Sequence, residues 1–232
     1  MNFLAHDVIL PPGSAVLTRV GASLPDIWVL LPRRPLPLAI VRGLRQRADP
    51  LGVQLADGIE SHMRADAVFH GHAEFQRRMA VASSHLRESV AGLRHTQLAA
   101  HVAVEMVLDR WLIDHDPGLL DRYYQSFDPA SLDTACRLGS HDPESATVLR
   151  QILDRFASSA FLREYVTAKG MVARWMRSLS RTPFAENRSV DESRWVELVE
   201  RWRSEFAEGS DKLIDDVRSG VEAWDKPGRS AP

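Results

Sequence analysis

Residues 57–72 read DGIESHMRADAVFHGH. Within this stretch His62, Asp66 and His70 follow one another at four-residue steps. On an α-helix such residues lie one above the other on the same face. Apolar residues recur between them at helical spacing, so the stretch predicts a helix over about 52–70. That helix carries imidazole, carboxylate and imidazole in a row along one face.

The remainder of the chain shows the same helical periodicity. Further helices are predicted over 14–23, 73–91, 95–114, 131–139, 143–156, 159–180 and, as one long final helix, 192–224. Asp142 and Asp191 stand where two of these helices would need N-caps. No sustained two-residue alternation, no repeat and no linker interrupts the pattern. The sequence therefore predicts an all-α fold, a single-domain helical bundle over 1–224, followed by a disordered tail over 225–232.

Apolar residues at helical spacing also indicate which helix faces are buried. In the helix over 95–114 the core candidates are Leu98, Val102, Met106 and Leu108. Trp195, Trp202 and Phe206 form an aromatic stripe along the final helix, and such a stripe is typical of a core or an interface.

Composition narrows the class of protein. The 232 residues are 44% hydrophobic and 26% charged with a net charge of −2, which gives no electrostatic reason to expect nucleic acid as a partner. The single cysteine excludes an internal disulfide and is typical of a reducing compartment. No apolar run is long enough to predict a membrane span, and the N-terminus lacks a signal peptide pattern, so we expect a cytoplasmic protein. The sequence leaves its oligomeric state open.

A second polar row lies on the predicted helix over 95–114. His101, Glu105 and Asp109 follow at four-residue steps on an otherwise apolar helix. Buried carboxylates need a compensating charge, which a metal ion or a nearby arginine such as Arg110 would supply. Taken alone, this row is as consistent with an ion-pair network as with metal ligation. Taken alone, the pair of His62 and Asp66 fits a surface ion pair better.

The polar residues together indicate one metal centre. Three separate segments each offer a histidine with a carboxylate beside apolar residues, as a helical metal site requires. The expected ligands of one or two divalent ions are His6, Asp26, His62, Asp66, His101, Glu105 and Asp109. Such a centre suits phosphoester hydrolysis. Phosphate-binding glycine loops, Cys/His zinc spacings and GxSxG elbows are missing from the sequence.

Three segments in order resemble the acyl carrier protein phosphodiesterases. They are MNFLAH at 1–6, GASLPD at 21–26 and GIESHMRAD at 58–66. The resemblance implies an all-α fold related to the HD-domain metal phosphohydrolases. It also implies release of 4'-phosphopantetheine from holo-acyl carrier protein, a reaction of lipid metabolism, with Mn²⁺ as the cofactor and Zn²⁺ or Mg²⁺ as alternatives. The acyl carrier protein would then be the partner.

On this hypothesis the residues take particular roles. Asp26 and Asp66 are the catalytic carboxylates, which orient or deprotonate the attacking water. Arg64 and His72 are expected to bind the phosphate. The basic segment over 33–47 is expected to bind the phosphate or an acidic surface of the carrier protein.

The chain departs from the family pattern at several positions. His70 and Glu105 each stand where the family has aspartate, Ala73 replaces a proline, and Arg110 replaces a histidine. Two alternatives follow. One is a helical interaction protein that keeps the scaffold without catalysis, because Arg110 could neutralise the carboxylates. The other is a hydrolase similar to zinc-dependent phospholipase C, whose His-x-x-x-Glu spacing His101 and Glu105 reproduce.

Overall fold

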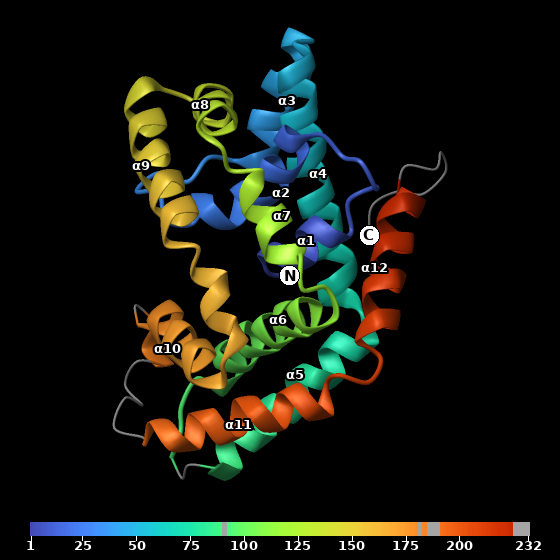
Figure 1. Ribbon diagram of the computed structural model, residues 1–232, viewed down its shortest axis with the longest axis vertical. Coiled ribbons are helices and arrows are strands. Elements are labelled where there is room, and N and C mark those ends of the chain that lie inside the picture. Colours follow the sequence, from blue (N-terminus) through green and yellow to red (C-terminus); the bar gives the residue numbers. More distant parts are fainter. Residues whose placement is uncertain (90–91, 181, 185–190, 225–232) are drawn as a thin grey trace. The chain divides into compact units, whose positions relative to one another are not determined.

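The computed structural model describes residues 1–89, 92–180, 182–184 and 191–224. These residues form helices joined by short turns and contain no strand, which confirms the predicted all-α class (Figure 1). The predicted tail over 225–232 lies outside the described residues, as do residues 90 and 91 at the end of the helix predicted over 73–91.

The contacts of the chain group into two compact units. Of the described residues, unit 1 comprises those within 1–68, 118–160 and 216–224, and unit 2 those within 69–117 and 161–215. The boundaries fall within helices α4 (Pro50–Gly71) and α12 (Ser210–Trp224). A single domain over 1–224 stays a prediction.

Unit 1 is built around two N-terminal helices. These are α1 (Phe3–Val8) and α2 (Val16–Trp28). The other helices that lie wholly in this unit are α3 (Pro37–Arg47), α7 (Leu119–Gln125), α8 (Pro129–Leu138) and α9 (Pro143–Ser159). Helix α1 packs against α2 and α7, and α2 packs against α8 and α9. The ring of Phe3 lies 5.0 Å from that of Phe156, which also contacts Tyr123 and Phe127. This aromatic cluster fixes α1 to the later helices of the unit.

Two glycines allow α2 and α4 to cross in backbone contact. A Cβ placed on Gly58 would lie 2.0 Å from the carbonyl oxygen of Thr18 and 2.7 Å from the backbone nitrogen of Ala22. A Cβ on Gly21 would lie 2.5 Å from the carbonyl oxygen of Leu55. Any larger side chain would separate the helices, since packed backbone cannot give way by such an amount. The crossing sets the position of the residues that follow Gly58 on α4.

Unit 2 has α5 (Ala73–Ser89) and α6 (Thr96–His115) as its central pair. The other elements are the 3₁₀ helix η1 (Phe161–Val166), α10 (Ala168–Leu179) and α11 (Glu192–Glu205). Helix α10 packs on α6, η1 and α11. The indole of Trp175 meets those of Trp195 and Trp202 edge to face, and its Nε1 donates to the carbonyl oxygen of Ala99. The aromatic stripe predicted for the final helix is therefore core.

The final helix is broken, where the sequence predicted one helix over 192–224. Helix α11 ends at Glu205, and α12 begins at Ser210 after Gly209, which has a φ of 76°. Glycine adopts this left-handed conformation without the steric cost that other residues meet. The helix predicted over 159–180 is broken as well, because the side chain of Thr167 accepts from the backbone nitrogen of Gly170 and starts α10 afresh.

Helix α2 is longer at its C-terminal end than the sequence predicted. The sequence predicted a helix only to residue 23, but α2 continues through Pro25 to Trp28. Asp26 is consequently a helical residue. The predicted caps are confirmed, because Asp142 accepts from the backbone nitrogen of Ser145 and Asp191 from that of Ser193.

One predicted core residue of α6 is on the surface. Leu98 is 43% exposed, whereas Met106 and Leu108 are buried as predicted. Leu98 lies three and seven residues before His101 and Glu105, so it shares their more open face. The opposite faces of α6 are filled by small residues, among them Ala99 and Ala103, which allow close packing.

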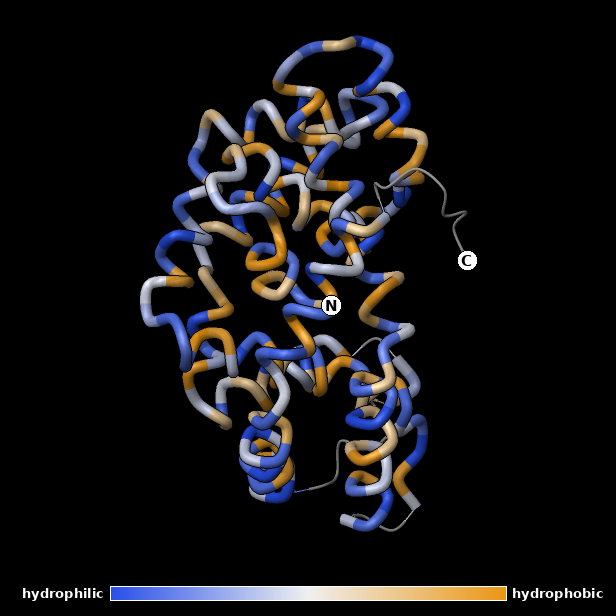
Figure 2. Tube along the Cα trace, turned by 90° about the vertical axis from the view of Figure 1, so that its right-hand side faces the viewer, coloured by the Kyte–Doolittle hydropathy of each residue, from blue (hydrophilic) through white to orange (hydrophobic). Residues whose placement is uncertain are grey.

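Hydrophobic and hydrophilic residues alternate with the turns of the helices. Figure 2 shows hydrophobic and hydrophilic residues interleaved along the helical turns, as in amphipathic helices. Among the described residues, none of the helices combines the length and the apolar character that crossing a membrane requires.

Candidate metal centre

The structure brings five of the predicted site residues, together with His70, into two groups of three. His6, His62 and Asp66 form one group, within unit 1. His70, His101 and Glu105 form the other, within unit 2. In each group the ligand atoms lie within 4.8 Å of one another. His70 therefore does not complete the row of His62 and Asp66, as the sequence suggested, but groups with residues of α6.

The N-terminal MNFLAH segment delivers His6 to the first group. Leu4 and Ala5 are fully buried, and Phe3 packs on Phe156, so α1 is fixed in the core of unit 1. Asp7 continues the buried segment and accepts two hydrogen bonds of 2.7 Å from the Nη1 atom of Arg19. These contacts hold the short helix in one position with the imidazole of His6 facing α4.

The imidazole of His62 is oriented by the backbone of α2. Its Nδ1 lies 2.8 Å from the carbonyl oxygen of Ala22, one residue beyond Gly21 in the crossing of α2 and α4. A carbonyl oxygen only accepts, so Nδ1 carries the proton and donates it. The Nε2 atom then faces the centre of the group, where it presents a lone pair when the imidazole is neutral. Histidines that bind metals are commonly fixed in this manner by a hydrogen bond at the other nitrogen.

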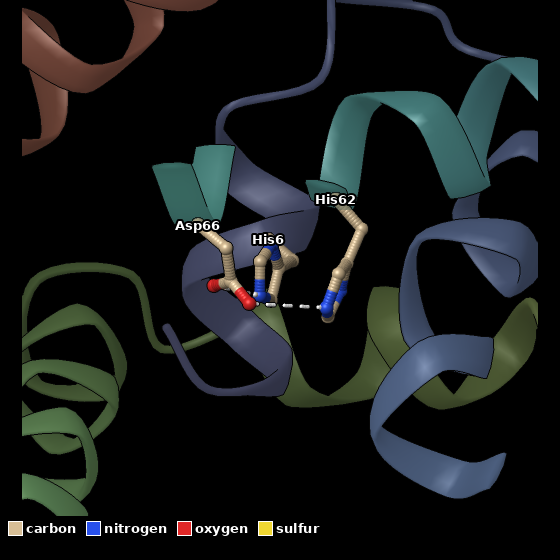
Figure 3. Close-up of side chains that lie close together, drawn as sticks. All are labelled: His6, His62 and Asp66. Carbon is tan, nitrogen blue, oxygen red and sulfur yellow. Dashed lines mark ion pairs between the residues drawn. The ribbon is translucent and has the colours of Figure 1, made fainter. Parts of the chain in front are cut away.

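Three side chains converge at this point (Figure 3). His62 and Asp66 come from successive turns of α4, and His6 comes from α1. His6 Nε2 lies 3.3 Å from Asp66 Oδ1, and His62 Nε2 lies 3.4 Å from Asp66 Oδ2. The two imidazoles stack with ring centroids 3.7 Å apart and planes inclined by 19°.

His6 is the most unusual member of the group. It is 1% exposed, and its ring nitrogens make no well-formed hydrogen bond with the described residues, although Nε2 lies 3.3 Å from Asp66 Oδ1. A buried polar group without a partner costs about 1–3 kcal/mol, so such an arrangement is rare in stable folds. Burial and the neighbouring His62 lower the pKa of His6 to about 3, which keeps its imidazole neutral. A neutral, buried imidazole is the form that binds a metal ion.

Asp66 supplies negative charge beside the two imidazoles. Burial would raise the pKa of its carboxyl, but contacts with His6 and His62 and the charge of the amino group of Met1 lower it well below its usual range. The amino group of Met1 donates to Asp66 Oδ1 at 2.6 Å. Asp66 is therefore ionised, and a cation already lies against one of its oxygens.

Asp26 lies at the edge of the same group. Its Oδ1 is 3.8 Å from His62 Nε2, and its side chain is 30% exposed, compared with 31% for Asp66. Burial would lower the pKa of His62, yet the contacts with Asp66, Asp26 and the Ala22 carbonyl raise it above its ordinary value. The imidazoles thus form the buried side of the group and the carboxylates form its solvent side.

The donor set fits a divalent metal ion. Bonds of about 2.0–2.2 Å place neighbouring ligand atoms about 2.8–3.1 Å apart around an octahedral ion and about 3.3–3.6 Å apart around a tetrahedral ion. The separations of 3.3 and 3.4 Å between Asp66 and the two imidazoles fall within the latter range. An ion bound by His6, His62 and Asp66, with Asp26 beside it, would also give the ring of His6 a close polar partner in place of a poorly formed hydrogen bond.

The second group is more open. His70 Nε2 and His101 Nε2 lie 3.3 and 3.0 Å from the same oxygen, Oε1 of Glu105. The side chains of the two histidines are 37% and 35% exposed, and that of Glu105 is 15% exposed. The ring of Phe75, which is buried, packs against both imidazoles at 5.3 Å.

Other predicted site residues stand apart from both groups. Asp109 is fully buried and belongs to neither. Arg64 lies 3.7 Å from Glu60 and lines a cavity of about 540 Å³ whose walls contain none of His6, His62 and Asp66. His72 Nδ1 accepts from the backbone nitrogen of Glu74 at the start of α5. The predicted binding of phosphate by Arg64 and His72 stays a prediction.

Arg110 was one of the alternatives for the charge that compensates the carboxylates of α6, the other being a metal ion. Its guanidinium bonds instead to the carboxylate of Asp114, at 2.5 and 3.0 Å, and donates to the carbonyl oxygen of Tyr165 at 3.2 Å. The imidazoles of His70 and His101, rather than this guanidinium, contact Glu105.

Sequence reasoning missed two parts of the first group. The carbonyl of Ala22 was not recognised, because a backbone acceptor leaves no signature in the residue type. Its only signal is the pair Gly21 and Gly58, which indicates close helix contact. The amino group of Met1 was missed as well, although MNFLAH places it five residues before His6.

With the geometry established, we compared the chain with known proteins. A scan against protein-family models, a search of curated proteins and a search of solved structures each gave no match.

Proposed function

We propose that this protein is a metal-dependent hydrolase that acts on phosphoric diesters. The observation that carries the proposal is the first group: two stacked, buried imidazoles face both oxygens of an ionised carboxylate. The buried ring nitrogens of His6 make no well-formed hydrogen bond with the described residues. A hydrolytic metal centre accounts for this arrangement, whereas an ordinary core would not retain it.

In this proposal some residues bind the metal ion and others act on the attacking water. A divalent ion bound here supplies a Lewis acid and a nucleophilic water at neutral pH. His6, whose lowered pKa keeps it neutral, and His62 would hold the ion from the buried side, and the Ala22 carbonyl would keep the proton of His62 on Nδ1 so that Nε2 faces the ion. Asp26 and Asp66 face solvent, where a substrate arrives, and Asp26 is placed to orient the water or accept its proton.

The metal of the proposal is Mn²⁺. Carboxylate and water ligands suit Mn²⁺, while two imidazoles suit Zn²⁺ as well. The solvent-facing carboxylates are the reason to place Mn²⁺ first. Mn²⁺, Zn²⁺ and Mg²⁺ should therefore all be compared.

The finer proposal is holo-acyl carrier protein as the substrate, with release of 4'-phosphopantetheine in the cytoplasm. It is supported by the resemblance of the three N-terminal segments and by an exposed surface between α2 and α3. There Arg33 and Arg34 are exposed, and Leu36 and Leu38 are 75% and 53% exposed. A basic and apolar surface of this kind is complementary to an acidic protein with an apolar patch.

The test is a hydrolysis assay on two substrates with added Mn²⁺, Zn²⁺ or Mg²⁺. One substrate is a small chromogenic phosphodiester, and the other is holo-acyl carrier protein. We expect metal-dependent hydrolysis that Asp66→Asn reduces by at least about 100-fold, as loss of a charged group at a reacting centre does. Asp57→Asn is the matched control, because Asp57 lies on the exposed side of the same helix.

The assay distinguishes failure of the proposed hydrolase activity from failure of the proposed carrier-protein substrate. Replacing Arg33 and Arg34 with glutamate should raise KM for the carrier protein and leave the small diester unaffected. Hydrolysis of the diester alone would reject the carrier protein as substrate. A chain that binds metal but hydrolyses neither substrate would favour the non-catalytic interaction protein.

A further inference from the structure

The second group of side chains, in unit 2, is built differently from the first. His70 lies in the last turn of α4, and His101 and Glu105 lie one turn apart on α6. Glu105 Oε1 is the common partner, at 3.3 Å from His70 Nε2 and 3.0 Å from His101 Nε2. Both imidazoles thus aim the same nitrogen at one carboxylate oxygen.

We propose that His70, His101 and Glu105 bind a Zn²⁺ ion. With Zn–N bonds of about 2.0–2.1 Å and a Zn–O bond of similar length, a tetrahedral ion holds its ligand atoms about 3.3 Å apart. The two measured separations lie close to that edge length. Two imidazoles with one carboxylate are also a ligand set that zinc takes in proteins.

The surroundings hold the ligands in place from one side. Phe75 is 2% exposed, and its ring lies 5.3 Å from both imidazoles, edge-on to His101. The carbonyl oxygen of His70 accepts from the side chain of Gln76 at 2.6 Å. The imidazoles therefore rest on a rigid apolar base, which reduces the ordering cost of binding an ion.

The other side of the group is open to solvent. The side chains of His70 and His101 are more than one-third exposed. A site with three protein ligands leaves the fourth position of zinc to water or to a small ligand, whereas a purely structural zinc site has four protein ligands. The site is built from other residues than the proposed hydrolytic centre and stands independently of it.

The alternative is a hydrogen-bonded triad in which both imidazoles donate to Glu105. That arrangement needs no ion, and its stability would not respond to zinc. The difference between the two can be measured directly, because zinc binding adds stability only to a protein that binds it.

The experiment uses the full chain carrying His62→Gln and Asp66→Asn, so that the first group cannot bind an ion. After treatment with a chelator, we expect one equivalent of Zn²⁺ in a calorimetric titration and a visible spectrum of tetrahedral Co²⁺. Saturating zinc should raise the melting temperature by roughly 5–10 °C, the shift for a ligand at about 100 times its dissociation constant and a chain of this size.

Two variants test the assignment. His101→Gln and Glu105→Gln keep the shape of the side chains, and each should weaken zinc at least tenfold, since loss of even an outer hydrogen-bond partner typically costs about 10–100-fold. His115→Gln, also on α6 and exposed, should leave binding unchanged. Zinc binding that is equal in Glu105→Gln and its parent would overturn the proposal, as would the lack of any zinc-dependent melting shift in a folded parent.

Discussion

His62 uses its two ring nitrogens for different purposes. Nδ1 is occupied by the carbonyl oxygen of Ala22, and Nε2 faces Asp66 and Asp26. His6 differs, because its ring is placed by stacking on His62 and by the buried helix α1 rather than by a hydrogen bond. A centre made this way is preorganised, since His62 is fixed by its hydrogen bond and His6 by its buried helix.

Replacing Asp26 with asparagine separates catalysis from metal binding. Asp26 lies at the solvent side, 3.8 Å from His62, so we expect Asp26→Asn to lower kcat by about 100–10,000-fold, the range for loss of a general base. Affinity for the metal should change by much less, because His6, His62 and Asp66 remain. Activity equal to that of the wild type would remove Asp26 from the mechanism.

Glu74 gives unit 2 a dependence on pH. Hydrogen bonds from Arg77 and Arg78 lower the pKa of Glu74 to about 2, from an ordinary value of 4.5. A carboxyl with a lowered pKa stabilises the fold above pH 4.5 and loses that contribution as the pH falls towards 2. We expect Glu74→Gln to cost about 1–2 kcal/mol at pH 7, a figure reduced for solvent screening.

The measurement for Glu74 is urea unfolding at several pH values. The difference between wild type and Glu74→Gln should shrink steadily between pH 4.5 and 2. Glu197→Gln, an exposed position on α11, serves as the control. A difference that stays constant over this range would show that the ion pairs of Glu74 do not contribute.

Individual site residues were predicted from the sequence with uneven success. The four-residue spacing of His62 and Asp66, and of His101 and Glu105, places each pair together because helix geometry alone decides it. Asp109 continues the row of α6 by the same rule, yet it lies in neither group. Which face of a helix meets which partner depends on tertiary packing, and a local spacing does not contain that information.

At the scale of elements, the crossing of α2 and α4 supports the proposed centre. Gly58→Ala would bring a methyl group 2.0 Å from the Thr18 carbonyl oxygen, so the helices must separate. We expect a loss of about 2–3 kcal/mol, typical of overpacking, together with weaker metal binding as Ala22 moves away from His62.

Gly71→Ala is the matched control for Gly58→Ala. Gly71 lies on the same helix with nothing within 4 Å of an added Cβ, so alanine there should be neutral or stabilising by up to about 1 kcal/mol. Thermal unfolding of both variants, with and without Mn²⁺, is the measurement. Equal stability of the two variants would mean that the crossing tolerates a side chain.

The helices themselves were largely predictable, and their breaks were less so. Amphipathic periodicity located the helices because burial of one face stabilises each of them. Gly209 interrupts a pattern whose periodicity runs on through α12, so the break at this position was missed. A glycine followed by serine and aspartate is nevertheless a signal for a helix end and a new cap, and it could have been used.

At the scale of the whole molecule, the sequence predicted the types of residue in the candidate site better than their grouping in space. It predicted histidines and carboxylates that gather from separate helices. It joined them into one centre, whereas the structure groups them in two sets of three, each inside its own unit. His70 groups with two residues of α6 because of long-range packing. The spacing of residues along α4 does not contain that information.

The central claim is that His6, His62 and Asp66 bind a divalent ion. Its most direct test is a calorimetric titration of the full chain with Mn²⁺ in a Glu105→Gln background, which disables the second group. We expect one equivalent of Mn²⁺, affinity at least tenfold weaker when His62→Gln is added, and no change when Asp57→Asn is added. Folded protein that binds no Mn²⁺, or binds it equally well with His62→Gln, would contradict the account.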